Sequence, residues 1–421
     1  MIQVLRNSWA LLLGLMLLML GNGLQGTLLG VRGEIEGFST FHMSLVMSTY
    51  FAGFLGGSRL APGMIRRVGH VRVFAALASF ISAVLILYPA YANPYAWMIE
   101  RLIIGFCFSG VYVTTESWLN NAATNETRGQ SLALYSIVQV LGILSAQGIL
   151  LLGDPAGFVL FIVPSILVSI SFAPILLSIS PTPAFESTKP MSLVELFKTS
   201  PLSIVGVFLV GGAFSAQFGM AAVFGTQAGM SIPQISLFIS MFYVGAVLAL
   251  FPLGWLSDRM DRRLLIGCEA VVAGFGALLG YVFGDSFIVL LVAAAIIGAM
   301  TNPLYSLLLA YLNDYLDSDQ MAAGSAGMMF VNGLGAIGGP VLTGWVMTLV
   351  GPGGFFLFIA ALLLATAGYA AYRMTRRPSL SSDDTGAYVA VMMSSSPVVV
   401  EAAQEWAADA AEDASDDETA A

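Results

Sequence analysis

One long apolar run of the sequence contains three charged residues, and Glu100 is expected to lie at the membrane interface because it is within two turns of the helix end. Arg101 and Glu116 lie in the run 95–118. At 100° per residue, Arg101, Gly105, Tyr112 and Glu116 fall within an arc of about 60°, so they share one face if the run is helical. Arg101 and Glu116 are then about 22 Å apart along the axis and cannot pair directly. A buried carboxylate could carry a proton, and a buried guanidinium could tune its surroundings or contact an anion.

Each of these two residues also allows a structural interpretation. Loop residues begin a few positions after Glu116, so its carboxylate could instead reach the membrane interface. Both interpretations of Glu116 stay open. Arg101 lies nearer the middle of its run, where a charge is costly, and this position favours a functional role.

Amide side chains are further polar groups inside the apolar runs. Such a group hydrogen-bonds either a substrate or a neighbouring helix. The amides are Asn22, Gln25, Gln139, Gln217, Asn302 and Asn332.

Residue types needed for several kinds of enzyme are scarce. Lys189 and Lys198 are the only lysines, and neither follows the glycine pattern of a nucleotide-phosphate loop. His42 and His70 stand at the ends of apolar runs, which leaves little material for a serine–histidine pair or a metal cluster. We therefore expect no enzyme, no cofactor and no metal site, and no direct use of ATP.

Composition and run length predict a membrane protein. Hydrophobic residues make up 57% of the 421 residues, charged residues make up 10%, and the mean hydropathy is +0.86. A soluble domain carries far more charge. Apolar runs of about 20 residues match a helix that crosses a ~30 Å bilayer, and these runs lack the alternation of barrel strands. We predict an all-α integral membrane protein with twelve transmembrane helices, at roughly 8–29, 40–62, 73–92, 95–118, 131–152, 157–178, 202–225, 234–256, 264–284, 286–312, 324–349 and 355–372.

The basic residues predict the orientation, because loops rich in Lys and Arg stay in the cytoplasm. With both termini cytoplasmic, thirteen of the sixteen Lys and Arg residues fall on that side. Arg32 falls in an outer loop, and Arg59 and Arg101 lie inside predicted helices.

The second half of the chain repeats the first at an offset of 192 or 193 residues. WLNN at 118–121 aligns with YLND at 311–314. The other pairs are Gln25 with Gln217, Gly105 with Gly298, Tyr112 with Tyr305, Gln139 with Asn332, and Gly142 with Gly335. Glu116 corresponds to Leu309, so the shared scaffold does not require an acid there. This repeat predicts two pseudo-symmetric six-helix bundles.

The predicted domains are an N-terminal bundle at 1–180, a cytoplasmic linker at 181–200, a C-terminal bundle at 201–377 and a tail at 378–421. The tail carries ten acidic residues and no basic one, which accounts for the overall net charge of −9. Its composition predicts a disordered, solvated segment, and a partner-binding role is the alternative.

The loop GWLSDRMDRR at 254–263 carries a charged motif. It resembles the signature G-x-L-[AS]-D-R-x-G-R-[RK] of the major facilitator superfamily, and two parallel six-helix repeats are typical of that family. The matching residues are Gly254, Leu256, Ser257, Asp258, Arg259, Arg262 and Arg263. Asp261 stands where the second glycine is expected. In the first half, PGMIRRVGHVR matches only at Arg67, Gly69 and Arg72, and Arg66 occupies the place of the aspartate.

The resemblance implies a secondary transporter that works by alternating access. In the family, these loops hold the two halves together on the cytoplasmic side when the cavity faces outward. We therefore expect Asp258 near Arg128 and Gly129, at the inner gate. The alternative is that the loop only sets topology, although arginines alone would do that.

The same resemblance implies which helices line the cavity, namely the first, fourth, seventh and tenth. The candidate cavity residues are Asn22, Gln25, Arg101, Tyr112, Glu116, Gln217, Asn302 and Tyr305. Gln139 and Asn332 are expected to pack between helices instead.

Shorter resemblances concern energy coupling. Arg101 and Gly105 resemble an R-x-x-x-G element linked to coupling in proton antiporters. GAIGGPVLTG at 335–344 resembles the antiporter pattern G-x-x-x-G-P, but in the eleventh run rather than the fifth. We expect protons as the coupling ion, with Glu116 as carrier and Arg101 as the tuner of its environment or an anion contact.

ESWLN at 116–120 resembles a poorly characterised bacterial branch of the family. The expected location is therefore the bacterial inner membrane, where the protein contacts lipid and a small-molecule substrate and acts as a monomer without nucleic acid. The sequence does not assign the substrate, and efflux is preferred over uptake. The rival interpretation is a transport-inactive receptor or scaffold that signals through the acidic tail.

Overall fold

The computed structural model describes residues 2–123, 125–177 and 191–376, together with Tyr388, Val391, Ala403 and Trp406. The rest of the predicted tail, and residues 181–190 of the predicted linker, lie outside the described residues. The described residues form helices and no strand. The helices are α1 (Ile2–Ile35), α2 (Thr40–Val68), α3 (His70–Ala90), α4 (Pro94–Ala122), α5 (Asn125–Leu150), α6 (Val159–Ser171), α7 (Ala173–Leu177), α8 (Leu193–Thr199), α9 (Pro201–Gln227), α10 (Ile232–Ser257), α11 (Arg262–Val282), α12 (Phe287–Asn313), α13 (Ser318–Val350) and α14 (Gly354–Met374).

The predicted all-α membrane fold is confirmed. Within the described residues, eleven helices are long and apolar enough to cross a membrane. α2 has 29 residues but also carries Arg59, Arg66 and Arg67, and it is not among the eleven. A twelfth span at α2 therefore stays a prediction. The sixth predicted run is divided into α6 and α7, and the short α8 lies inside the predicted linker.

Local sequence signals explain where several helices begin. The side chain of Asn93 accepts a hydrogen bond from the backbone N–H of Tyr95, directly before Pro94 opens α4. Ser231 and Gln234 form a capping box at the start of α10. These residues satisfy backbone groups that a helix end leaves unpaired. Gly69, at φ +86°, provides the turn between α2 and α3.

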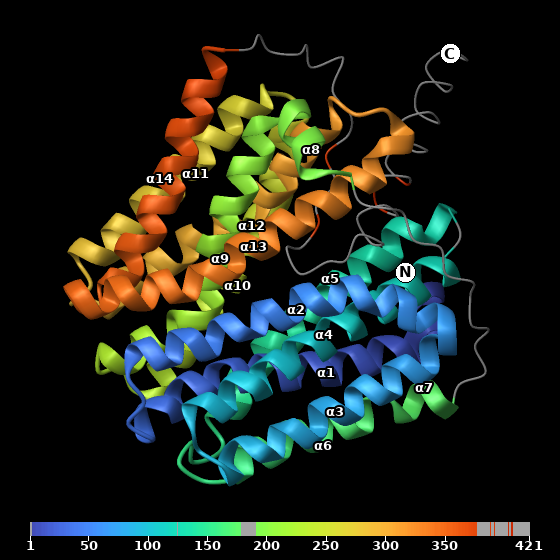
Figure 1. The fold of residues 1–421 in the computed structure, drawn as a ribbon, viewed down its shortest axis with the longest axis vertical. Helices are drawn as coiled ribbons and strands as arrows, with labels where there is room; N and C mark the ends of the chain where they lie inside the picture. The colour runs from blue at the N-terminus through green and yellow to red at the C-terminus, as the bar shows by residue number, and fades with distance from the viewer. Residues whose placement is uncertain are drawn as a thin grey trace.

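The two halves of the chain form two similar bundles. α1 to α7 fill the lower part of Figure 1, and α8 to α14 fill the upper part. Equivalent helices pair in both halves: α2 packs on α4 as α10 packs on α12, and α1 packs on α5 as α9 packs on α13. This pattern is what a repeat offset of 192 or 193 residues predicts.

Glycines at equivalent positions allow the closest helix crossings. A Cβ at Gly105 would overlap the carbonyl oxygen of Tyr50 on α2. A Cβ at Gly298 would overlap the carbonyl oxygen of Phe242 on α10. Gly105 and Gly298 are 193 residues apart, and Tyr50 and Phe242 are 192 residues apart, so the repeat preserves both sides of the contact. Small residues let helix backbones approach in this way.

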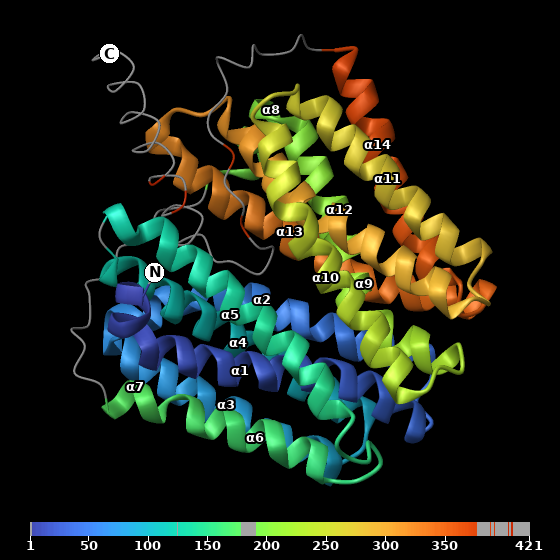
Figure 2. The same cartoon turned by 180° about the vertical axis from the view of Figure 1, so that it is seen from behind.

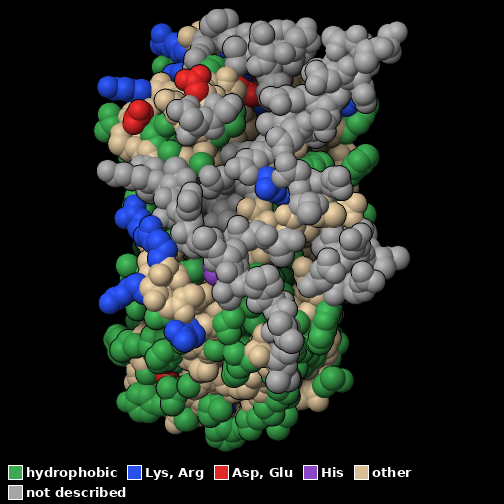
Figure 3. Space-filling model, turned by 90° about the vertical axis from the view of Figure 1, so that its right-hand side faces the viewer, with side chains coloured by type: hydrophobic (Ala, Val, Ile, Leu, Met, Phe, Trp, Pro, Cys, Tyr) green, Lys and Arg blue, Asp and Glu red, His purple; other side chains and the backbone are tan. Residues whose placement is uncertain are grey.

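The halves meet on two sides of the molecule. α2 packs along α13, visible from the front in Figure 1, and α5 packs against α10, visible from behind in Figure 2. One end of the bundle carries arginines at the ends of α2, α10 and α14, and we call it the basic face. Arg66 and Arg259 are exposed there, and Arg373 is half-buried. Figure 3 looks onto this face, where Lys and Arg side chains stand out in blue.

Candidate functional site

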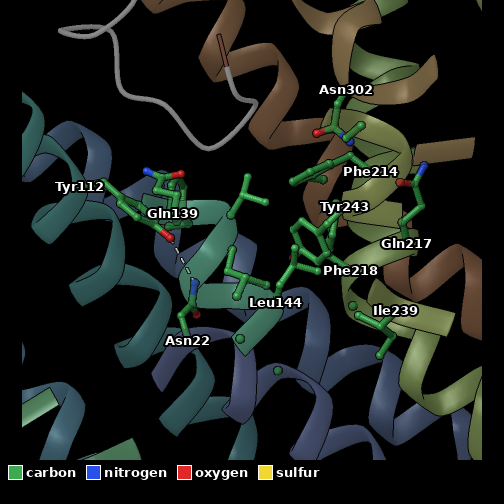
Figure 4. Close-up of a pocket in the computed structure, with 18 of the residues that line it drawn as sticks. Asn22, Tyr112, Gln139, Leu144, Phe214, Gln217, Phe218, Ile239, Tyr243 and Asn302 are labelled. Carbon is green, nitrogen blue, oxygen red and sulfur yellow. Dashed lines mark hydrogen bonds between the residues drawn. The ribbon is translucent and has the colours of Figure 1, made fainter. Parts of the chain in front are cut away.

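A cavity of about 510 Å³ lies between the two halves. Its wall is built by residues of α1, α2, α4 and α5 from the first half and of α9, α10, α12 and α13 from the second. Figure 4 shows the two walls, with Asn22 and Tyr112 on one side and Gln217 and Asn302 on the other. A volume of this size can hold a small organic molecule.

Aromatic side chains cover much of the second-half wall. The ring centroids of Phe214 and Phe218 are 4.5 Å apart, and those of Phe218 and Tyr243 are 5.0 Å apart. Tyr50 and Phe54 add aromatic surface from α2. Such a wall favours a ligand with an apolar, flat part.

A hydrogen-bond network occupies the first-half wall. Arg101 Nη1 donates to Gln25 Oε1 at 2.7 Å, and Gln25 Nε2 donates to Asn22 Oδ1 at 3.2 Å. Asn22 Nδ2 then donates to the hydroxyl oxygen of Tyr112 at 3.1 Å, and the Tyr50 hydroxyl lies 3.5 Å from Asn22 Oδ1. The network fixes the direction of the Arg101 guanidinium, whose carbon lies 4.7 Å above the ring centre of Tyr50.

Several buried amide atoms of the wall have no hydrogen-bond partner. Gln217 donates to the Thr301 hydroxyl at 3.0 Å, which leaves its Oε1 unpaired. Gln139 Nε2 and Asn332 Oδ1 are also buried and unpaired. A buried polar atom without a partner is costly, so each of these atoms is suited to a ligand or water.

The cavity is closed at the end opposite the basic face. There Gln227 Nε2 donates to the Thr40 hydroxyl, and the Ser48 hydroxyl donates to the Ile337 carbonyl at 2.6 Å, so hydrogen bonds join the two halves. The cavity opens between α5 and α10, where its lining residues are 45 to 71% exposed. These residues are Ile137, Leu141, Val247 and Leu248.

Of the predicted cavity residues, the structure places Asn22, Gln25, Arg101, Tyr112, Gln217 and Asn302 in the lining, and leaves out Glu116 and Tyr305. Glu116 is 0% exposed, and its Oε1 accepts a hydrogen bond from the Tyr135 hydroxyl of α5. Tyr305 is 1% exposed inside the second bundle. Gln139 and Asn332, which were expected to pack between helices, contribute to the lining.

Apart from Tyr112, sequence reasoning missed the aromatic residues of the lining, although the repeat marks two of them. Phe51 and Tyr243 both line the cavity and are 192 residues apart. An aromatic pair at the repeat offset was therefore a usable signal. Phe214 and Phe218 lie one turn apart on α9, but so do many packing pairs, so their spacing alone does not indicate a cavity.

Two ion pairs of the charged loop 254–263 lie within the second half. Arg262 pairs with Asp314 at the end of α12, and both side chains are buried. Asp261 caps α11 by accepting a hydrogen bond from the backbone N–H of Arg263, and it also pairs with the Arg263 side chain at 2.7 Å. Burial raises the pKa of Asp261, but the hydrogen bonds from Arg263 outweigh this effect and leave the pKa below its usual value.

The remaining motif residues are mostly exposed. Arg67 and Arg72 flank the turn at Gly69, and Arg259 lies over the ring of Trp255 at 4.4 Å. Asp258 Oδ1 accepts a hydrogen bond from the backbone N–H of Tyr388, whose ring lies against Gly254.

Gly129, one of the two expected neighbours of Asp258, lies against another described residue of the predicted tail (378–421), here called the terminal segment. A Cβ at Gly129 would meet the ring of Trp406. Val391 contributes to the cavity lining and exchanges hydrogen bonds with the Ser306 hydroxyl. In this conformation, Asp258 and Gly129 therefore contact residues of the terminal segment, Tyr388 and Trp406, where we expected Asp258 to meet α5.

Two pseudo-symmetric helical bundles around a central cavity, closed on one side, define a membrane transport protein rather than an enzyme. Residues 203–400 match the family described as Major Facilitator Superfamily, and residues 12–185 match the family described as Sugar (and other) transporter. The chain belongs to the major facilitator superfamily.

Curated relatives resemble almost the whole chain. The chain is 26% identical over 380 residues to the uncharacterized MFS-type transporter YcaD of Escherichia coli. The aligned region covers 86% of this chain and 97% of the relative. The chain is 24% identical over 359 residues to an uncharacterized MFS-type transporter of Yersinia pestis, and this aligned region covers 84% and 92%.

Solved structures share the fold at low sequence identity. A variant of the nucleoside transporter NupG superposes with a TM-score of 0.74 at 14% identity, over 87% of this chain and 99% of that one. A bacterial homolog of the human lysosomal transporter Spinster, in an inward-facing and occupied conformation, superposes with a TM-score of 0.68 at 15% identity, over 90% and 98%. The family matches, rather than these structures, make the protein a multi-pass secondary transporter for a small molecule in a lipid membrane.

Proposed function

We propose that the protein moves a small solute across the bacterial cytoplasmic membrane by alternating access, and that the central cavity is its substrate site. The observation that carries the proposal is the asymmetry of the cavity. It is closed at one end by hydrogen bonds between the halves, such as Ser48 to Ile337, and opens between α5 and α10. Rocking of the halves would exchange the closed and open sides.

The basic face is the cytoplasmic face in this proposal. Loops rich in arginine are retained in the cytoplasm, and Arg66, Arg259 and Arg373 stand on this face. The end closed by hydrogen bonds between the halves is then the outer end, so the conformation described is closed toward the outside. We propose export as the direction, so that a substrate would enter from the inside and leave after the halves rock.

Proton coupling through Glu116 is the finer part of the proposal. Its carboxylate lies inside the membrane-spanning part of α4, away from the cavity surface. Its partner Tyr135 is one helical turn from Gln139, which does line the cavity. A proton taken up by Glu116 would change this buried contact and so the packing of α4 against α5, which is how a titration can bias the two conformations.

The access proposal predicts that a cysteine in the cavity is reachable from both sides of the membrane. We replace Leu144 with cysteine in a Cys268→Ser background, since Cys268 is exposed whereas Cys107 is buried. An impermeant maleimide should modify position 144 in inside-out and in right-side-out vesicles. Peptide mass spectrometry reads the modification at this position alone.

The matched control locks the closed end. Thr40→Cys and Gln227→Cys, whose parent side chains are hydrogen-bonded, are joined by a short bifunctional thiosulfonate. The lock should abolish modification from the outside and preserve it from the inside. Outside modification that never occurs, or that persists in the locked protein, contradicts alternating access.

The coupling proposal predicts that pH shifts the balance between the two conformations. The readout is the ratio of inside to outside labelling rates at Leu144→Cys, because the thiolate fraction cancels in the ratio. In the otherwise unmodified chain, this ratio should change several-fold between about pH 5 and pH 8. Glu116→Gln should flatten this response, because the amide cannot titrate.

Tyr305→Phe is the control for this experiment, because Tyr305 and Glu116 are both buried and both lie outside the cavity lining. It should keep the full pH response. A response that survives Glu116→Gln removes Glu116 from the coupling mechanism.

A further inference from the structure

The charges of the cavity are distributed unequally. Arg101 is the single charged side chain among the described lining residues, and it stands on α4 in the first half. The second-half wall offers only neutral amides, aromatic rings and aliphatic groups. The cavity surface therefore carries one fixed positive charge at one end of its polar network.

Arg101 has no acidic partner among the residues that the structure describes. The Arg101 guanidinium contacts Gln25 Oε1, the Met47 sulfur at 3.2 Å and the ring of Tyr50. Its Nε atom is buried without a partner, and the residue is only 3% exposed. A buried guanidinium keeps its charge and is normally compensated by a carboxylate or another anion. An amide oxygen and a π face compensate it only in part.

The unpaired polar atoms of the cavity wall differ between its two sides in whether they donate or accept hydrogen bonds. On the first-half side, Gln139 Nε2 is an unpaired donor, as is Arg101 Nε. On the second-half side, the unpaired atom of Gln217 is an acceptor, because its Nε2 already donates to Thr301. A complementary ligand would accept hydrogen bonds at the α4 and α5 side and donate one at the α9 side.

Apolar surface connects these two polar ends. The rings of Phe214, Phe218 and Tyr243 form the second-half wall. The opening between α5 and α10 is lined by exposed apolar side chains, including Leu141 and Val247. A ligand with an apolar, flat body would pass this opening and pack against the rings.

We propose that the substrate is an amphipathic organic anion, whose anionic group pairs with Arg101 and whose aromatic body packs against Phe214, Phe218 and Tyr243. A carboxylate or a phosphate ester meets the same two requirements, because the guanidinium fork binds both. The inference rests on the proposed function, since it names the substrate class for the same cavity.

The test measures protection of Leu144→Cys from maleimide in purified protein by four naphthalene probes. They are 2-naphthoate, 2-naphthyl phosphate, 2-naphthalenemethanol and 2-naphthylmethylamine. They share the aromatic body and differ in charge. At least one anion should protect at a concentration about 10-fold or more below the neutral alcohol, and the cation should protect least. The two anions distinguish a carboxylate from a phosphate ester.

Substitutions of Arg101 test whether its guanidinium causes the preference for anions. Arg101→Met should remove the preference for the anion, and Arg101→Lys should keep part of it, because lysine retains the charge but not the fork. Arg59→Met is the matched control, because Arg59 also lies over an aromatic ring, that of Phe330 at 3.9 Å, but outside the lining. It should leave the preference unchanged.

Three outcomes overturn the substrate class: protection by none of the probes, equal protection by alcohol and anions, or an anion preference that survives Arg101→Met. Each of them leaves the access experiment untouched. Labelling of position 144 from both faces would still support transport, so failure of the substrate class and failure of the transport proposal are distinguishable.

Discussion

Replacing Gly105 or Gly298 with alanine is expected to abolish stable folding of the protein in detergent. At each position, the added Cβ would overlap a backbone carbonyl oxygen of the facing helix, that of Tyr50 for Gly105 and that of Phe242 for Gly298. A backbone atom cannot rotate away as a side chain can, so α4 must separate from α2, or α12 from α10. Overpacking that side chains relieve costs about 1 to 3 kcal/mol, and we expect these two substitutions to exceed that range.

The measurement is the yield of monodisperse protein in size-exclusion chromatography, followed by thermal melting. Gly148→Ala and Gly368→Ala are the controls, because a Cβ at either position meets nothing within 4 Å. They should be neutral or raise stability by roughly 0.5 to 1 kcal/mol through the better helix propensity of alanine. Normal yield and melting of Gly105→Ala would contradict the close crossing.

These glycines also show what the sequence could predict. The repeat aligns Gly105 with Gly298. The structure places them at equivalent helix crossings, α4 on α2 and α12 on α10. The apolar runs predicted the helices because run length and composition are set by the bilayer itself. Helix ends were less predictable, because caps such as Asn93 and Gly69 act over only one turn.

The position of Glu116 shows what the sequence could not predict. A helical wheel puts it on one face with Arg101 and Tyr112, yet only these two reach the cavity. α4 packs against different neighbours at different depths, and at Glu116 the same face meets Tyr135 of α5. The angular position of a residue on its helix does not show where neighbouring helices cross that helix. It therefore cannot distinguish a residue of the cavity wall from a residue in an interhelical contact.

Asp258 is a second example. Its motif predicted a contact with the start of α5, but in this conformation its carboxylate accepts a hydrogen bond from the backbone N–H of Tyr388 in the predicted tail. The family motif indicates a contact between the two halves in the outward-open conformation. In the opposite conformation the surfaces that make this contact are separated. The gate role of Asp258 therefore stays a prediction for the outward-open state.

Removing the side chain of Arg262 is expected to produce the second largest loss of stability. Arg262 and Asp314 form an ion pair whose side chains are 3% and 2% exposed. Asp314 also sits at the C-terminal end of α12, where the helix dipole disfavours a negative charge. Arg262→Ala leaves this carboxylate buried without its cation, at a cost of about 3 to 5 kcal/mol. Thermal melting of the purified protein should show a clear downward shift.

Two comparisons separate this mechanism from a general effect of losing an arginine. Arg259→Ala, three residues earlier, removes an exposed cation over Trp255 and should change melting little. The double variant Arg262→Met with Asp314→Leu should recover most of the lost stability, because an apolar pair of similar volume avoids the desolvation of both charges. If the double variant melts as low as Arg262→Ala, the destabilisation comes from lost packing around the guanidinium rather than from the stranded carboxylate.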